Sequence, residues 1–408
     1  MRAPETKVRE AAGPAINTSE RQKSFIRKRV EGGGSKKNSA IIREWKCAII
    51  LPIMEKIDIK NLLKGELKKE LSAMGGEPYR ATQIFRWLYK ASVNSFDDMT
   101  DLGRSLREKL KSRFHLTKLI LSDSKSSLID GTTKYLFKLE DGNTIESVFL
   151  PEDKRATFCL SSQVGCKFGC SFCASAALGF VRNLKASEIL DEVLFIRSHN
   201  EGATITNIVF MGIGEPLDNY DNVMKAIRIL NDKDAFNIGA RRITLSTCGI
   251  IPGIERLSGE KLQIELSVSL HAADDNVRSR LVPVNKKYCL KDLIAACKNY
   301  TKKTNRIITF EYVLIKGVNC SSADAIKLSS LLKGVKCKVN AISYNQIRAG
   351  PAPLASLGFR AGRYEAPGRE DVRDFMNTLE ENRIKATHRK SKGEDIDAGC
   401  GQLRISKF

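Results

Sequence analysis

The sequence predicts an α/β protein with a parallel β-sheet, preceded by a small helical domain. From Arg155 onward, β-rich runs alternate with amphipathic helical stretches, and apolar residues recur at helical spacing from Lys56 to about Leu116. The 408 residues give room for two or three domains. Strand–helix alternation implies a parallel sheet, either doubly wound or curled as a barrel. In both cases functional residues gather after the carboxyl ends of the strands.

Composition excludes several classes of protein. Apolar residues make up 42% of the chain and charged residues 28%, which is ordinary for a globular protein. No apolar run reaches the 18 or more residues of a membrane span and no signal peptide is visible, so a soluble, cytoplasmic protein without membrane contact is expected. The formal net charge of +21 suggests a polyanionic partner such as nucleic acid, although a basic surface alone would also explain it. Eleven cysteines without an export signal favour metal or redox chemistry over disulfides.

The chain divides into four predicted parts. Residues 1–53 carry 12 Lys or Arg and 5 Asp or Glu and show no periodicity, so we expect a flexible basic arm, with Met54 as an alternative start. Residues 54–117 form the helical domain, 118–154 a β-hairpin linker and 155–408 the α/β core. Residues 349–368, rich in Gly, Pro and Ala, are expected to form a surface loop.

The helical domain is expected to have a buried face and a basic face. Leu63, Leu67 and Leu71 form one apolar stripe, and Gly75–Gly76 supplies a helix stop. A second stripe holds Leu102, Leu106 and Leu110, and a helix between the stripes turns Ile84, Phe85 and Leu88 inward. The outer side chains Arg80, Arg86 and Lys90 either contact phosphate or stay solvated.

The linker is expected to be a hairpin. Two β-rich runs, 134–139 and 143–150, are joined through Asp141–Gly142, a strong turn signal. Strand alternation places Glu146 on the same face as Val148 and Leu150, which favours an inward carboxylate.

Six strands and five helices are expected in the core. The strands are 156–161, 207–211, 242–246, 263–270, 307–315 and 338–343. The helices are 187–199, 219–231, 290–301, 322–332 and 369–382.

The sharpest motif follows the first core strand. Cys166, Cys170 and Cys173 are spaced Cys-x3-Cys-x2-Cys. Three thiolates this close suit an iron–sulfur cluster or zinc. Structural zinc requires four protein ligands, so a [4Fe-4S] cluster with one open iron fits better. Coincidental buried cysteines are the alternative.

Further motifs carry a resemblance to a known family. They are Leu160-Ser-Ser-Gln-Val-Gly-Cys166, Gly212-Ile-Gly-Glu-Pro-Leu217, Ser269-Leu-His-Ala272 and Gly393-Glu-Asp-Ile-Asp-Ala-Gly-Cys-Gly-Gln-Leu403. From about Met54 to Leu403 the chain resembles the RlmN-type radical S-adenosylmethionine (SAM) RNA methyltransferases. The resemblance implies a partial (β/α)6 barrel, one [4Fe-4S] cluster on Cys166, Cys170 and Cys173, and SAM. It also implies methylation at C2 of an adenosine in the peptidyl transferase centre of 23S rRNA and in tRNA, with the helical domain binding RNA.

The resemblance also implies three catalytic residues. Cys400 would carry the methyl group as S-methylcysteine, Cys159 would resolve the RNA adduct by a transient disulfide with Cys400, and Glu146 would accept the proton from C2. The residues themselves allow plainer interpretations: Cys400 as a free thiol on a tail, Cys159 as a buried core cysteine on a strand and Glu146 as an exposed strand carboxylate. Gly399 and Gly401 beside Cys400 favour a mobile loop.

The expected SAM site lies at the carboxyl ends of the strands. Gly212 and Gly214 allow a close backbone approach that suits the methionine amino group, and Glu215 can accept from that amine. By resemblance the SAM-binding residues are Gly214, Glu215, Ser246, Ser269, Leu270, His271 and Asn345.

Other expectations concern partners and rivals. An electron donor such as flavodoxin or ferredoxin and a monomeric state are expected. One rival is a methyltransferase acting at C8 of the same rRNA adenosine, and another is a non-catalytic zinc-bound RNA-binding protein. Two features depart from the family pattern: Lys392 stands where arginine is expected, and the 349–368 loop is longer.

Overall fold

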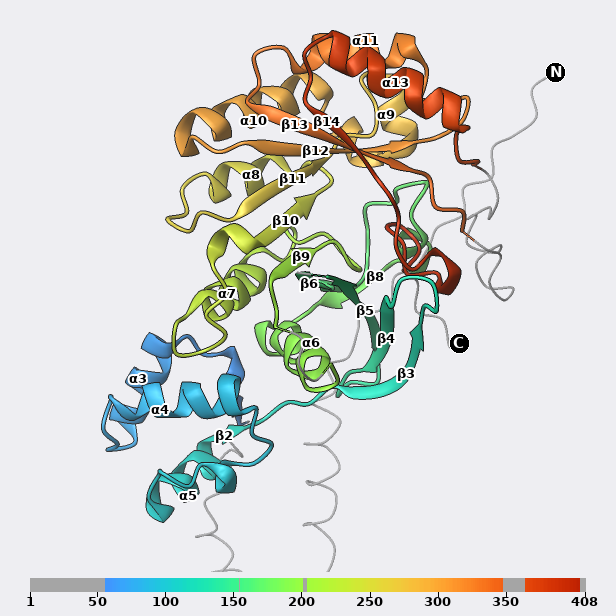
Figure 1. The fold of residues 1–408 in the computed structure, drawn as a ribbon. Helices are drawn as coiled ribbons and strands as arrows, with labels where there is room; N and C mark the ends of the chain where they lie inside the picture. Colours follow the sequence, from blue (N-terminus) through green and yellow to red (C-terminus); the bar gives the residue numbers. More distant parts are fainter. Residues whose placement is uncertain (1–55, 154, 201–203, 348–363, 404–408) are drawn as a thin grey trace, which may run out of the picture. The chain divides into compact units, whose positions relative to one another are not determined.

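The computed structural model describes residues 56–153, 155–200, 204–347 and 364–403. The expected basic arm and most of the expected 349–368 loop lie outside these residues. Within them, a ten-stranded sheet runs in the order β14-β13-β12-β11-β10-β9-β6-β5-β4-β3 (Figure 1). From β6 to β14 neighbouring strands are parallel, while β3, β4 and β5 extend the sheet in antiparallel fashion. The predicted parallel α/β core is confirmed.

The strands follow the prediction closely. The parallel strands are β6 (Arg155–Cys159), β9 (Asn207–Phe210), β10 (Ile243–Thr247), β11 (Glu265–Ser269), β12 (Ile308–Leu314), β13 (Cys337–Ser343) and β14 (Ala386–Arg389). The antiparallel ones are β3 (Ile120–Ser126), β4 (Thr133–Lys138) and β5 (Thr144–Glu152). The six expected core strands are all present, whereas β14 and β3 of this sheet were not foreseen. Nor were the short strands of the two small sheets, β1 (Ile57–Asp58) with β2 (Phe114–His115) and β7 (Gln163–Gly165) with β8 (Phe180–Asn183). Both β14 and β3 lie at sheet edges, and their largely exposed side chains give no apolar alternation.

The core helices connect successive parallel strands. They are α6 (Ala186–Ser198), α7 (Tyr220–Asn231), α8 (Ile251–Leu257), α9 (Asp275–Leu281), α10 (Leu290–Thr304), α11 (Ser322–Leu332) and α13 (Arg369–Glu381). Each of the five expected core helices forms within three residues of its predicted ends, and α8 and α9 are additional. Six of these seven helices have an acidic residue in the first turn, where it interacts favourably with the helix dipole: α6, α7, α9, α10, α11 and α13.

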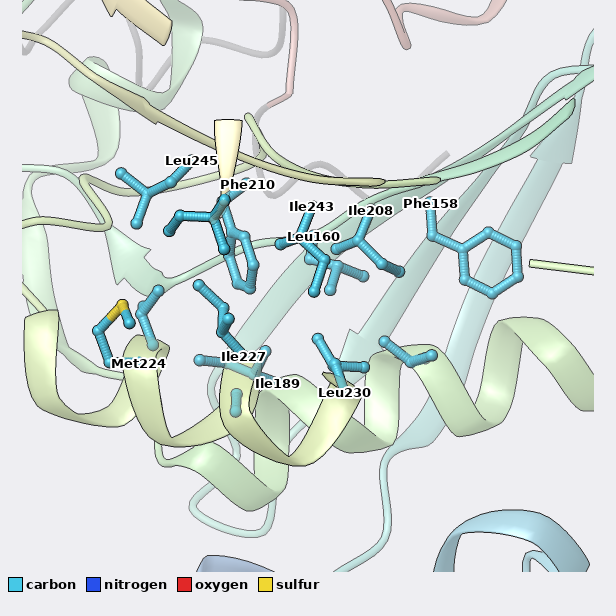
Figure 2. Close-up of a cluster of buried hydrophobic side chains, with 14 of the residues drawn as sticks. Phe158, Leu160, Ile189, Ile208, Phe210, Met224, Ile227, Leu230, Ile243 and Leu245 are labelled. Carbon is cyan, nitrogen blue, oxygen red and sulfur yellow. The ribbon is translucent and has the colours of Figure 1, made fainter. Parts of the chain in front are cut away.

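The main core lies between the sheet and its helices, as Figure 2 shows. Side chains from β6, β9 and β10 meet those of α6 and α7. The labelled members are Phe158, Leu160, Ile189, Ile208, Phe210, Met224, Ile227, Leu230, Ile243 and Leu245. Each is at most 1% exposed, and a fully buried side chain of this kind contributes about 1.5–3 kcal/mol relative to an exposed one. This packing fixes the strands whose carboxyl ends carry the site.

The helical domain packs beside α6 and α7. Its helices α3 (Lys64–Ala73), α4 (Arg80–Arg86) and α5 (Arg104–Arg113) bury the predicted apolar stripes almost entirely. Lys60 forms a buried ion pair with Asp191 of α6. Arg86, expected as a free basic side chain, instead bonds to Asp234 at 3.0 Å. Part of the predicted basic face therefore ties the domain to the core.

One face of the hairpin formed by β4 and β5 points to the inner side of the curved sheet. The register pairs Val148 with Cys159 on β6 and with Lys134 on β4. Because side chains alternate along strands, Glu146 shares this face, and it is fully buried. The predicted inward carboxylate is confirmed.

In the described part of the chain, no helix is long and apolar enough to cross a membrane.

Candidate active site

A cavity, here called cavity 1, opens at the carboxyl ends of β9 to β13. It gathers ten of the thirteen predicted site residues: Cys166, Cys170, Cys173, Gly214, Glu215, Ser246, Ser269, His271, Asn345 and Cys400. Parallel strands end at one edge of a sheet, so residues far apart in the chain meet there. The other three predicted residues, Cys159, Glu146 and Leu270, do not line cavity 1.

The cysteine loop begins after a short strand, β7 (Gln163–Gly165), that pairs with β8 (Phe180–Asn183). Gly165 has a φ of +73°, and a Cβ there would lie 1.8 Å from the carbonyl oxygen of Gly179, so only glycine fits. The Cys166 amide donates to the same oxygen at 2.8 Å. This closure brings the three cysteines to one wall of cavity 1.

The donor set fits an iron–sulfur cluster. Burial raises the pKa of the Cys166 thiol to about 12 and also raises the pKa values of Cys170 and Cys173, so positively charged iron would be needed to hold them as thiolates. Among the described residues, no three His, Cys, Asp or Glu side chains are grouped to hold a single metal ion. In a [4Fe-4S] cluster each thiolate binds a different iron, so three sulfurs along one wall suffice.

Glu215 lies buried beside the cysteines. Its two carboxylate oxygens accept the amides of Leu217 at 3.0 Å and Cys248 at 2.7 Å, and burial raises its pKa. Each oxygen has lone pairs left for a further donor. Glu215 can therefore accept from an amine in cavity 1.

Gly212 and Gly214, which precede Glu215, are required by close contacts within the chain itself, whereas we expected them to allow the close approach of the methionine amino group. A Cβ on Gly214, whose φ is +102°, would lie 2.6 Å from the Cβ of Gln163. A Cβ on Gly212 would lie 2.6 Å from the carbonyl oxygen of Leu160. The close approach that they allow is to the chain's own segment between β6 and β7.

His271 and Asn345 present polar atoms from two further strand ends. His271 has a φ of +58°, and its Nδ1 accepts the Val313 amide at 3.0 Å, which leaves the proton of a neutral ring on Nε2. Burial, with the nearby Arg278 charge, lowers the pKa of His271 to about 3. Asn345 donates from Nδ2 to the Cys400 carbonyl at 3.0 Å, while its buried Oδ1 has no hydrogen-bond partner among the described residues. Because Asn345 lines cavity 1, this oxygen is an unsatisfied acceptor beside the cavity.

The segment that carries Cys400 is held in place rather than loose. The Gly401 carbonyl accepts the Ala174 amide at 2.7 Å, and the Leu403 carbonyl accepts the Ser175 hydroxyl at 2.7 Å. A Cβ on Gly399 would lie 2.7 Å from Asn345 Nδ2, and Gly401 has a φ of +83°. The expectation of a mobile loop therefore differs from this structure, in which Gly399 permits close contact with Asn345 and Gly401 lies against Phe172 and Cys173 of the cysteine loop.

Cys400 also lines a second cavity, called cavity 2, together with Cys159. Cys159 is 8% exposed, so it is both the buried strand cysteine of the plainer reading and a neighbour of Cys400. Burial, and then the proximity of Cys400, raises the pKa of Cys159 to about 12. Cys400 is exposed by surface area because it faces two cavities, yet the surrounding protein still raises the pKa of its thiol.

Two predicted residues line neither cavity. The Glu146 carboxylate lies on the same strand face as Val148, behind cavity 2, with Oε1 3.5 Å from Lys134 Nζ. That ammonium also donates to the Asp397 carbonyl at 3.1 Å, which links Glu146 to the segment before Cys400. Leu270 is a fully buried core residue whose carbonyl accepts Arg278 Nε at 3.0 Å.

Sequence reasoning missed two buried charged residues near the site. Glu311 of β12 lines cavity 1 and accepts Asn340 Nδ2 at 2.7 Å; a lone carboxylate inside an apolar strand could have signalled it. Arg278 of α9 is fully buried and donates to the carbonyls of Cys248 and Ser269, the residues that follow or end β10 and β11. An arginine on a short helix gives no such signal in the sequence.

Comparison with known proteins gives the class and then the family. A family model described as the Radical SAM superfamily matches residues 160–328, the part that carries the cysteine loop and most of cavity 1. The chain is therefore a radical SAM enzyme, a class that uses SAM and a [4Fe-4S] cluster. A second model, described as the ribosomal RNA large subunit methyltransferase N-terminal domain, matches residues 57–116.

Close relatives narrow the class. A Thermoanaerobacter sp. (strain X514) protein named "Probable dual-specificity RNA methyltransferase RlmN" is 46% identical over 85% of this chain and 97% of its own length. A Clostridioides difficile (strain 630) protein of the same name is 43% identical over 86% and 98%. A radical SAM methyltransferase structure from Sphaerobacter thermophilus matches with a TM-score of 0.79 and 44% identity, over 86% of this chain and 100% of that one. The chain belongs to the RlmN family of radical SAM RNA methyltransferases. It is an enzyme, so the non-catalytic RNA-binding alternative is wrong.

Proposed function

We propose that the enzyme methylates C2 of an adenosine in 23S rRNA and in tRNA, and that the methyl group travels through Cys400. The carrying observation is the position of Cys400, which lines both cavities. Cavity 1 holds the three cysteines and the open acceptors that suit SAM, and cavity 2 holds the second thiol, Cys159. A carrier between a donor site and an acceptor site needs this placement.

A direct transfer from SAM would be too slow at this carbon. C2 of adenine is an electron-poor sp2 carbon, so it is a poor nucleophile toward the methyl group of SAM. Cys166, Cys170 and Cys173 would hold the cluster, which with SAM and one electron from a reductant would supply the 5′-deoxyadenosyl radical needed to activate a methyl group on Cys400. Covalent catalysis by Cys400 divides the reaction into loading and transfer.

The chain's own residues orient the partners of both steps. Glu215 and Asn345 Oδ1 are placed to accept N–H groups of SAM in cavity 1, and Ser246, Ser269 and His271 line the same wall. Burial keeps His271 neutral near pH 7, so it adds no charge beside the sulfonium. The high pKa of the Cys400 thiol means that loading requires loss of its proton before or during attack on the methyl group.

Glu146 and Cys159 are proposed to complete the transfer. Glu146 would accept the C2 proton of the radical adduct, and the unpaired electron would pass to a one-electron acceptor. The Cys159 thiolate would then attack the Cys400 sulfur and break its bond to the methylene carbon, which takes up a proton to become the methyl group. The resulting disulfide would be reduced by an external thiol before the next turnover. Glu146 is covered in this structure, so its role requires the segment around Asp397 to shift when RNA binds. General-base groups of this kind contribute about 10²–10⁴-fold.

Nucleoside analysis tests the proposal. The reconstituted enzyme is incubated anaerobically with SAM, a reductant and either 23S rRNA fragments or tRNA, and the digested RNA is examined by mass spectrometry against standards. We expect 2-methyladenosine. Formation of 8-methyladenosine without 2-methyladenosine would instead establish the C8 rival. A flavodoxin or ferredoxin donor, a monomeric state and a cytoplasmic location stay predictions.

A further inference from the structure

Cavity 2 has two unlike walls. Its inner wall is apolar and consists of Val148, Leu150, Val209, Met211, Ile342 and Leu403. Its other wall is basic, with Arg389 at the end of β14 and Lys390 and Lys392 just after it. No Asp or Glu of the described chain lines the cavity. An apolar surface beside cations suits a planar base joined to a phosphate. The cavity has a volume of about 30 Å³ in this structure, too little for a purine, so a base enters only when the segment around Asp397 shifts.

The three cations are not equivalent. Lys392 donates to the Pro151 carbonyl at 2.8 Å and lies 3.2 Å from Glu152 Oε1, so its charge is already neutralised by the hairpin. Arg389 is half-buried and Lys390 is exposed. Neither makes a side-chain hydrogen bond or ion pair with any residue that the structure describes. Two unpaired charges at the mouth of a cavity are placed to receive an anion.

Cys159 and Cys400 lie in the same cavity as these cations, so an anion bound there would be close to both thiols. Arg389, Cys159 and Cys400 all line cavity 2, and the Arg389 charge acts on both thiols and, without an ion pair, on the buried Glu311 carboxylate. A guanidinium offers paired donors that match phosphate oxygens, and an adjacent ammonium adds a point charge. A base extruded from its stack must enter together with its own phosphate, because the two are covalently joined.

We propose that Arg389 and Lys390 bind the RNA phosphate next to the target adenosine and seat its base in cavity 2, against the apolar wall and beside Cys400. This inference rests on the proposed function, since it assigns the RNA half of the same reaction. Lys392 is a positioning residue that holds the basic segment to the hairpin. Cavity 2 accounts only for the contact at the reacting nucleotide, and RNA binding by the helical domain stays a separate prediction.

The test compares two charge-matched double variants. Arg389→Gln/Lys390→Gln removes two charges at cavity 2, and Lys291→Gln/Lys327→Gln removes two from exposed positions on α10 and α11. Binding of a substrate tRNA or rRNA fragment is measured over a range of salt concentrations, together with KM for RNA. We expect the cavity 2 variant to lose about 10–100-fold in RNA affinity and to flatten the slope of log Kd against log salt by about 1–2. The control should stay within about threefold of the starting protein.

Two RNA-independent readouts separate the outcomes. Reductive SAM cleavage without RNA should be unchanged in the cavity 2 variant, as should its thermal unfolding midpoint. Loading of a methyl group onto Cys400 should slow only modestly, because loss of the Arg389 charge raises the pKa of that thiol. Unchanged RNA affinity and salt slope would overturn the inference, as would a loss confined to Cys400 loading, because Arg389 would then serve the thiol rather than RNA. Failure of the proposed function would give a different result, because the starting protein itself would then form no 2-methyladenosine.

Discussion

Cavity 1 and cavity 2 share Cys400 but are built in different ways. Cavity 1 is formed by strand ends and by one short loop, and its polar groups lie on motifs that are contiguous in the sequence. Cavity 2 is formed by the inner face of β5 and β6 together with β14 and the segment after it, which come from opposite ends of the described core. Both cavities bring distant parts of the chain together, but most polar residues of cavity 1 lie in recognisable motifs or at strand ends, whereas the basic residues of cavity 2 lie outside every motif identified in the sequence.

The segment that carries Cys400 joins the two cavities. Asn345 and Ala174 hold it from the side of cavity 1, and Lys134 holds it from the hairpin side at the Asp397 carbonyl. The position of this segment therefore depends on contacts at both cavities. A displacement that uncovers Glu146 would also break the hydrogen bond from Lys134 to the Asp397 carbonyl. RNA binding at the hairpin would in this way change the position of Cys400.

The largest expected effect separates the two cavities by chemistry. Cys170→Ala should lose bound iron and sulfide and both SAM cleavage and RNA methylation. Cys400→Ala should retain iron, sulfide and SAM cleavage but lose RNA methylation by about 10⁴-fold or more, since a covalent carrier is removed. Iron and sulfide analysis, 5′-deoxyadenosine assays and nucleoside mass spectrometry measure these outcomes. Cys289→Ser, at a cysteine outside both cavities, is the control, and RNA methylation by Cys400→Ala would contradict the assignment.

A smaller effect is expected on the acceptor side. Glu146→Gln keeps the side-chain shape but removes the proton acceptor, so RNA methylation should fall by about 10²–10³-fold while methyl loading of Cys400 stays unchanged. Single-turnover assays and peptide mass spectrometry distinguish the two steps. Normal turnover in this variant would leave Glu146 as a structural partner of Lys134.

The contrast between the cavities also explains what could be predicted from the sequence. The cysteine loop, Glu215 and the ends of the core strands were predictable because each lies within a short motif or a periodic run. Arg389 and the pairing of β14 with β13 were not, since an exposed four-residue edge strand has no apolar pattern. The meeting of Cys159 with Cys400 came only from resemblance, because the side-chain directions of a barrel interior and a C-terminal segment depend on tertiary packing.

The floor of cavity 1 provides a stability test. Gly214→Ala combines a φ of +102° with a Cβ 2.6 Å from Gln163, so it should destabilise the fold by about 3 kcal/mol. Gly142→Ala has a φ of +85° but open space around its Cβ and should cost only about 1 kcal/mol. Denaturant unfolding of the two variants gives the comparison. Equal losses would show that the close approach to the segment between β6 and β7 is unimportant.

The smallest effect concerns His271 and pH. Its pKa in the folded protein is about 3, below the usual 6.5, so the unfolded chain takes up the proton first as pH falls. The stabilisation is complete above pH 6.5 and is lost progressively between pH 6.5 and 3. From pH 7 to pH 5 this residue should cost about 2 kcal/mol of unfolding free energy. His271→Gln should lack that part of the pH dependence in denaturant unfolding, and an identical pH dependence would contradict burial of a neutral ring.

The central claim, that Cys400 carries the methyl group from cavity 1 to cavity 2, is tested most directly by an isotope chase. The enzyme is loaded with unlabelled SAM, freed of excess SAM, and then given RNA, reductant and SAM with a ¹³C-labelled methyl group for one turnover. If Cys400 is the carrier, the first methylated adenosine contains the unlabelled carbon and the label appears on Cys400 or in later products. If the first product contains the ¹³C carbon instead, the methyl group passes directly from SAM to RNA and the account is wrong.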